Sequence, residues 1–180
     1  MTAPGFLPAD LVFTSPTSFF GNGIGWATRG KGEGATWAKH VGGFVGSDQV
    51  VESLWRTVQH PLSEVSVPLQ VWRHISLTDW DRAVIATKAR SYVGAPYGGA
   101  KIITHLGDAL LGKLFGGNPY VFRRLAHRDD YPICSWTWAW SFAEIGYLFG
   151  VEPRAAQPDD MHDWCASHPD HWTKIYEAAA

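Results

Sequence analysis

Cysteine is scarce in this sequence, which has only Cys134 and Cys165 among its 180 residues. Two cysteines cannot build the disulfide framework that stabilises small secreted domains. An excess of one charge sign is lacking too, because the formal net charge is −2 at pH 7. A nearly neutral chain gives no electrostatic reason to expect a nucleic acid or an anionic membrane as partner.

Long apolar runs are also missing, and no uninterrupted run approaches the length of a membrane span. We therefore expect no stable membrane insertion. Residues 1–8 lack the basic segment followed by an apolar stretch that begins a signal peptide. The expectation is a protein that is cytoplasmic at synthesis. If it acts at the cell wall, a virion or a secretion machine would be the partner that delivers it.

What the chain does contain predicts one globular domain over residues 1–180. Apolar residues make up 46% and charged residues 18%, which excludes a disordered chain. A length of 180 residues is enough for a full core. Ten tryptophans are unusual, and we expect them to fill the core or to line an aromatic groove.

The residue pattern predicts an α+β fold with an antiparallel sheet. Residues 46–48 are typical of a hairpin connection, and the residues after 158 predict a short final helix and a polar tail, with Trp164 and Trp172 packing on the core. The predicted strands are 9–13, 40–45, 49–58 and 69–75, and the predicted longer helices are 77–93, 101–115 and 135–149, with a shorter one over 17–28.

Cys134 is the first candidate functional residue. It follows the turn Tyr131-Pro132-Ile133 and opens a strongly apolar helical run. The N-terminus of a helix carries unsatisfied N–H groups and the positive end of the macrodipole, so a thiol there is shifted toward the nucleophilic thiolate. The alternative is a buried cysteine that acts as a small apolar residue.

His40 and Glu52 are the candidates for the groups that would activate this thiol. His40 opens a β-like run, and the predicted hairpin places Glu52 nearly opposite on the paired strand. A carboxylate there can hold one ring nitrogen and leave the other facing the cysteine. The alternatives are a polar residue at a strand end for His40 and a solvated polar residue for Glu52.

These segments resemble a known group of enzymes. His40-Val41-Gly42 followed by Val50-Val51-Glu52 is similar to the His-Val-Gly strand pair of the NlpC-like cell-wall peptidases, and Cys134-Ser135 resembles their nucleophile helix. The cysteine follows the histidine, as in the circularly permuted branch of YiiX/YebB-like papain-fold proteins and their lecithin–retinol acyltransferase relatives. The opening segment at residues 9–13 and the closing segment at residues 158–161 also resemble that branch, so the resemblance spans about residues 9–175.

The resemblance implies a permuted papain-like (NlpC-like) fold in which the sheet packs on the nucleophile-bearing helix. It assigns Cys134 as nucleophile, His40 as base and Glu52 as third polar member. Gly94-Ala95-Pro96-Tyr97 is similar to a Gly-x-Pro-Tyr turn, which makes Tyr97 a candidate oxyanion donor beside the backbone N–H of Cys134. Its alternative is an aromatic residue packed on the core.

Two further substrate-binding candidates complete the predicted site. Ser135 belongs to the Cys-Ser pair, and Trp37 lies in the segment that leads to His40. Two departures from the family pattern matter. Unpermuted members more often have His or Asn at the third position, and tryptophans replace the usual small or aliphatic residues after Cys-Ser. These three tryptophans are Trp136, Trp138 and Trp140.

The implied function is hydrolysis of an amide bond, with peptidoglycan stem peptides as the leading substrate and no cofactor or metal. Three alternatives remain. The same fold carries acyltransferases and hydrolases of lipid amides or esters, and it could also serve as a non-catalytic module that binds glycan or peptide. The third is a metal site, because the C-terminal region holds four His and Cys residues spaced three apart. They are His162, Cys165, His168 and His171.

Overall fold

The computed structural model describes residues 5–15, 37–96 and 133–179. They form an α+β fold with a six-stranded antiparallel sheet in the order β4-β3-β2-β1-β5-β6. The strands are β1 Leu11–Thr14, β2 His40–Phe44, β3 Gln49–Ser53, β4 Thr57–Pro61, β5 Leu69–His74 and β6 Trp172–Ala178. The helices are α2 Asp79–Ser91, α5 Cys134–Ala143 and α6 Pro158–Ser167, with 3-10 turns η1 Leu62–Glu64 and η2 Pro153–Ala155.

The predicted helix over 77–93 is confirmed as α2, and its start is fixed by a capping box. The Thr78 hydroxyl accepts from the Asp81 backbone N–H at 3.2 Å, and the Asp81 carboxylate accepts from the Thr78 N–H at 2.9 Å. The predicted helix from residue 158 is confirmed as α6.

The predicted helix over 135–149 ends too late. In the structure α5 begins at Cys134 and ends at Ala143. Gly146 adopts φ of 76°, and its N–H donates to the carbonyl of Ala143 while the N–H of Tyr147 donates to Phe142. This left-handed residue closes the helix because glycine adopts positive φ without a steric penalty. The apolar residues beyond it continue the core without continuing the helix.

Two expectations about strands are wrong. The run over 49–58 is divided between β3 and β4 by a turn at 54–56, and the chain after 168 forms the edge strand β6 instead of a tail. Trp172 of β6 is buried, as expected. The helices predicted over 17–28 and 101–115 lie outside the described residues.

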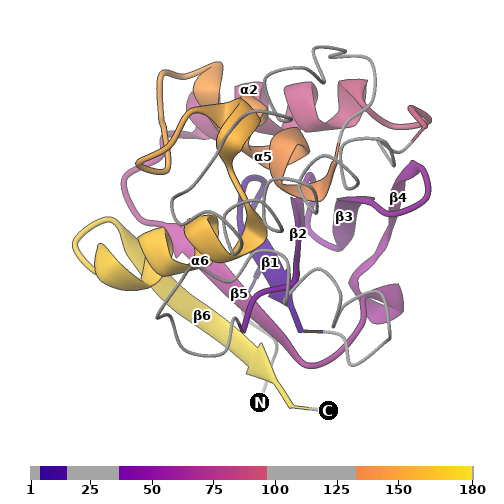
Figure 1. The fold of residues 1–180 in the computed structure, drawn as a ribbon, viewed down its shortest axis with the longest axis horizontal. Helices are drawn as coiled ribbons and strands as arrows, with labels where there is room; N and C mark the ends of the chain where they lie inside the picture. Colours follow the sequence, from indigo (N-terminus) through magenta and orange to yellow (C-terminus); the bar gives the residue numbers. More distant parts are fainter. Residues whose placement is uncertain (1–4, 16–36, 97–132, 180) are drawn as a thin grey trace, which may run out of the picture.

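The three helices and the sheet enclose the larger of two apolar cores. Leu11, Phe13, Val41 and Val51 contribute one face of the sheet, and α2, α5 and α6 contribute the rest of this core. Figure 1 shows α6 crossing in front of β1 and β5, with α5 and α2 together nearer the top of the view. The alternate residues of the strands form a smaller core on the other face, with Phe6, Val12, Phe44, Val50, Val65, Leu69 and Val71.

Close contact between α5 and the middle of the sheet places the N-terminus of this helix. The Trp138 indole N–H donates to the carbonyl of Val51 at 3.1 Å, and its ring lies over Gly43. The hydroxyl of Ser53 lies 2.7 Å from that of Thr137 and 2.9 Å from that of Thr57. These buried bonds fix the first turns of α5 against β3 and β4.

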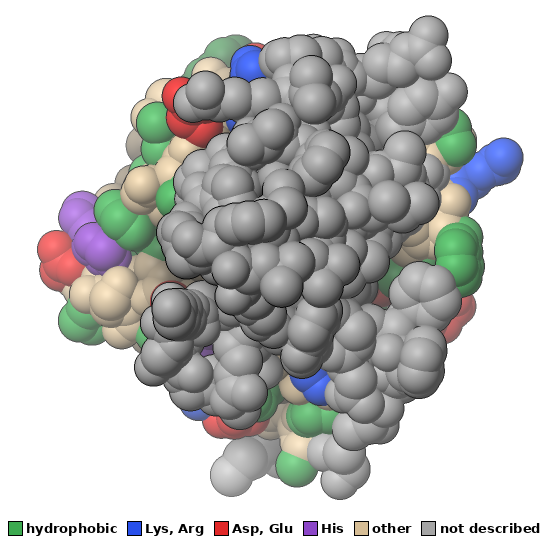
Figure 2. All heavy atoms as spheres, viewed as in Figure 1, with side chains coloured by type: hydrophobic (Ala, Val, Ile, Leu, Met, Phe, Trp, Pro, Cys, Tyr) green, Lys and Arg blue, Asp and Glu red, His purple; other side chains and the backbone are tan. Residues whose placement is uncertain are grey.

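The described surface mixes charges of both signs with apolar side chains, as Figure 2 shows along the rim of one face. Within residues 5–15, 37–96 and 133–179, no helix combines the length and the apolar character that a bilayer span requires.

Gly43→Ala should destabilise the fold. A Cβ at this position would lie 2.7 Å from the Trp138 ring, so the helix or the strand must move. We expect a loss of about 1–3 kcal/mol in the free energy of unfolding, as for other overpacked cores. Gly46→Ala is the control, because its Cβ would meet no atom closer than 3.9 Å. Denaturant unfolding that gives equal stability for both variants would contradict this account of the packing.

Candidate active site

Cys134 is the first residue of α5, and its position favours the thiolate. Ile133 precedes it in extended conformation and provides no side-chain cap, and the first turn contains no acidic residue. The positive end of the helix therefore acts on the sulfur without competition from a carboxylate. The backbone N–H groups of Val41 and Ser135 also stabilise the charged sulfur.

His40 lies between the cysteine and Glu52. Its Nε2 is 2.9 Å from Oε1 of Glu52, and the ring makes a second hydrogen bond to Cys134. Since Nε2 is held by the carboxylate, Nδ1 is the nitrogen left for the sulfur. The side chains of His40 and Glu52 are 12% and 5% exposed, so this contact is largely shielded from water.

The three groups shift one another's pKa. Burial alone would lower the pKa of His40, but the Cys134 thiolate and the Glu52 carboxylate outweigh it and raise the pKa to about 10. Burial opposes ionisation of Cys134, yet the His40 imidazolium holds the pKa of this thiol below its ordinary value. Burial would also raise the pKa of Glu52, but its hydrogen bonds with His40 and His60 lower it to about 2. The favoured state is a thiolate–imidazolium pair beside an ionised carboxylate.

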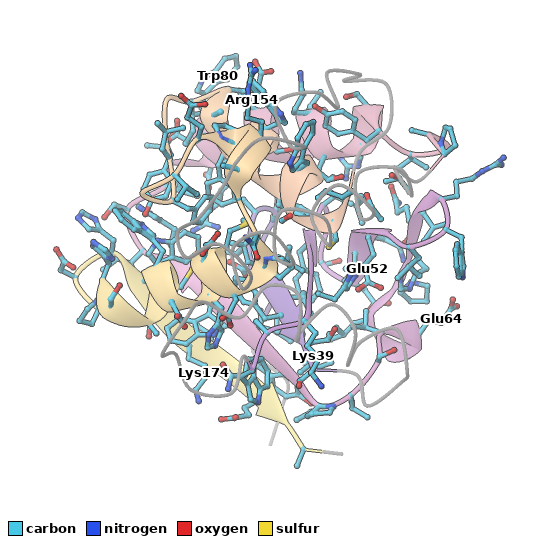
Figure 3. All side chains as sticks on the ribbon, viewed as in Figure 1. Lys39, Glu52, Glu64, Trp80, Arg154 and Lys174 are labelled. Carbon is cyan, nitrogen blue, oxygen red and sulfur yellow. The ribbon has the colours of Figure 1, made fainter. Side chains whose placement is uncertain are left out.

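Strand register explains why Glu52 reaches His40. Gly42 is the residue directly opposite Glu52, so His40 is its diagonal neighbour on the paired strand. Gly42 provides the space, because a Cβ there would lie 2.7 Å from Cγ of Glu52 and 3.2 Å from its Oε1. Figure 3 shows Glu52 within the molecule near β3 and Glu64 at its rim on η1.

His60 is a fourth member of the site that the sequence analysis did not identify. Its Nε2 lies 2.8 Å from Oε2 of Glu52, so each carboxylate oxygen holds one imidazole. The register pairs Val50 with His60 and Glu52 with Val58, which puts His60 diagonal to Glu52. The expected single strand over 49–58 concealed the second hairpin, on whose second strand His60 lies.

The other predicted site residues have different surroundings. Ser135 is completely buried, and its hydroxyl has no hydrogen-bond partner among the described residues. Its backbone N–H, rather than its hydroxyl, faces the Cys134 sulfur. Trp37 is partly buried and stacks on His162 with ring centroids 5.2 Å apart. Tyr97 lies outside the described residues.

The four His and Cys residues near the C-terminus do not gather around one point. His162 bonds Gln70 at 3.0 Å, Cys165 is buried, and His168 bonds the carbonyl of Trp164 at 2.8 Å. In the described part of the chain, no three His, Cys, Asp or Glu side chains form a group that could hold a metal ion.

Comparison of the chain with family models, with curated proteins and with solved structures finds no match. The chemistry that the site can perform therefore follows from its geometry.

Alkylation should distinguish the two cysteines. The pKa of Cys134 lies below the ordinary thiol value, so its rate of alkylation should stay high as the pH falls below about 8.5. Burial raises the pKa of Cys165 well above its usual range, so that thiol should remain unmodified. Iodoacetamide labelling across pH, followed by peptide mass spectrometry, measures both residues in one sample. Equal labelling of the two thiols would argue against an activated Cys134.

Gly42→Ala should disturb the site more than the fold. The added Cβ would displace the Glu52 carboxylate from His40, so the thiolate should form only at higher pH. Loss of one charge-assisted hydrogen bond corresponds to about a 10- to 100-fold lower alkylation rate at neutral pH. The control is again Gly46→Ala, which should alkylate like the wild type. If the pH profile of alkylation in Gly42→Ala equals that of the wild type, the contact between Glu52 and His40 does not require the missing side chain at residue 42.

Proposed function

We propose that this chain is a cysteine hydrolase of permuted papain-like type that cleaves an amide bond through an acyl-enzyme on Cys134. The observation that carries the proposal is the hydrogen-bonded series Cys134–His40–Glu52 at the N-terminus of a buried helix. Cys–His catalysis requires a thiolate, an imidazole within reach and a group that orients the imidazole. The order of the elements supports the permuted arrangement, because β2 and β3 precede the nucleophile helix.

The reaction begins with attack of the Cys134 sulfur on the carbonyl carbon, which forms a C–S bond and a negative carbonyl oxygen. The backbone N–H of Cys134, at the helix terminus, is the candidate donor to that oxygen. The His40 imidazolium gives its proton to the leaving amine as the C–N bond breaks. His40 then takes a proton from water, which attacks the thioester and releases the acid and the thiolate.

Glu52 acts on the imidazole and not on the substrate. Its carboxylate holds Nε2 of His40, which keeps Nδ1 directed at the sulfur and stabilises the imidazolium. Its low pKa keeps it ionised throughout the physiological range.

Peptidoglycan stem peptide is the proposed substrate, on the resemblance of the His40 and Cys134 segments to cell-wall peptidases. The test is digestion of purified peptidoglycan followed by mass analysis of the fragments, which identifies the bond that is cleaved. Lipid amides, esters and acyl acceptors other than water are tested in parallel, because all of these reactions pass through the same thioester.

Substitutions should separate the roles of the three residues. Cys134→Ala should abolish turnover, since no acyl-enzyme can form, whereas Cys165→Ala should retain it. Glu52→Gln should reduce turnover by up to ~10⁴ while substrate binding persists, because it removes the charge that orients and stabilises the imidazolium. Glu152→Gln is the matched control at an exposed position. Turnover and thermal melts are measured for each variant.

Two outcomes would contradict the proposal. Wild-type activity in Cys134→Ala would exclude the nucleophile. Binding of peptidoglycan without turnover of any cell-wall, peptide or ester substrate by the wild type would favour the non-catalytic binding module.

A further inference from the structure

His60 lies on the far side of Glu52 from the thiol. The Glu52 carboxylate bridges two imidazoles, with Oε1 at 2.9 Å from His40 and Oε2 at 2.8 Å from His60. The side chains of both histidines are 12% exposed and that of Glu52 is 5% exposed. Each oxygen of this carboxylate therefore has a hydrogen-bond partner within the protein, at a position with little exposure to solvent.

The hydrogen-bond partners of His60 determine its protonation state. Its Nδ1 lies 3.2 Å from the carbonyl oxygen of Pro61, which can only accept a hydrogen bond. Its Nε2 faces the ionised Glu52, which also can only accept. The imidazolium, with hydrogen on both ring nitrogens, is the state that satisfies both contacts.

The charges around His60 agree with this state. Glu52 of β3 contacts Nε2, and Glu64 of η1 lies 4.0 Å from Nδ1. The like charge of His40 lies beyond the Glu52 carboxylate, which separates the two rings. The hydrogen bond to Glu52 is the main cause that raises the pKa of His60 above its ordinary value, against partial burial.

We propose that His60 is a positioning residue, whose imidazolium holds the Glu52 carboxylate in the orientation that serves His40 and adds positive charge on the far side of that carboxylate from the thiolate. The catalytic consequence rests on the proposed function, but the effect on the thiol does not. Charge alternates along the series, from the negative sulfur of Cys134 to the positive ring of His60. The series is neutral overall, which makes its burial less unfavourable than that of a net charge.

The direction of the effect on Cys134 follows from two contributions. Removal of the His60 charge takes one cation away from the series that ends in the thiolate, which raises the pKa of the thiol. It also frees one oxygen of Glu52, so the carboxylate can rotate away from His40, and a less stabilised imidazolium raises the thiol pKa again. Both contributions have the same sign.

The experiment compares His60→Leu and His60→Gln with the wild type. His60→Leu should move the midpoint of Cys134 alkylation about one pH unit higher and lower kcat by about 10- to 100-fold, with a smaller change in KM. A glutamine at residue 60 keeps an N–H donor without the charge. It should therefore recover most of kcat while the midpoint stays above that of the wild type. His171→Gln is the matched control, because His171 is half exposed and contacts Asp170 instead.

A purely structural role gives a different result. His60 also joins β3 to β4, so its loss can lower the melting temperature without any effect on the thiol. An alkylation midpoint equal to that of the wild type in both folded variants would overturn the inference and leave the thiol chemistry intact. Full turnover in Cys134→Ala would instead overturn the proposed function.

A measurement on the wild type tests the inference even if the variants of His60 do not fold. The C2 proton of His60, assigned by NMR, should titrate with a midpoint above the ordinary histidine value of about 6.5. A midpoint at or below that value would show that the ring is neutral at neutral pH and would overturn the inference.

Discussion

The site depends on how closely α5 approaches the middle of the sheet. Gly43 has no side chain, so the Trp138 ring packs directly on β2, and its indole N–H reaches the carbonyl of Val51 on β3. The hydroxyl of Ser53 holds Thr137 one turn from the helix start. These contacts fix the N-terminus of α5 beside the first residue of β2, and this placement brings Cys134 to His40. The two adjacent glycines have different roles. Gly43 leaves room for the Trp138 ring of α5, and Gly42 leaves room for the Glu52 carboxylate.

A buried charged group is unfavourable unless an opposite charge or a hydrogen bond compensates it. Here each charged group has such a partner. Glu52 accepts two imidazole hydrogen bonds, and Cys134 has His40 together with two backbone N–H groups. The helix N-terminus contributes the N–H of Ser135, whereas the N–H of Val41 comes from β2. The partners that stabilise the buried charges therefore depend on the same contact between α5 and the sheet that places Cys134 beside His40.

Local patterns in the sequence predicted part of this arrangement. The capping residues around Thr78 predicted the start of α2, and the turn residues at 46–48 predicted the pairing of β2 with β3. Both signals are local, because they involve residues only a few positions apart. The pairing was sufficient to bring Glu52 near His40. The end of α5 was not predictable in the same way, because apolar residues continue past Gly146 for reasons of core packing. His60 was missed because its contact depends on a turn at 54–56 that contains no glycine, asparagine or proline signal.

The two cysteines show that position determines the chemistry of a thiol more than burial does. Cys134 and Cys165 both lie in the larger core. Cys165 is in the interior of α6, where backbone N–H groups are already used within the helix, and burial raises its pKa. Cys134 stands at the start of α5, where the backbone N–H of Ser135 faces its sulfur and where His40 supplies a positive charge, and its pKa falls although it is also buried. The pKa of the same residue type therefore moves in opposite directions in the two helices, because Cys134 lies at a helix start beside His40 and Cys165 lies in a helix interior.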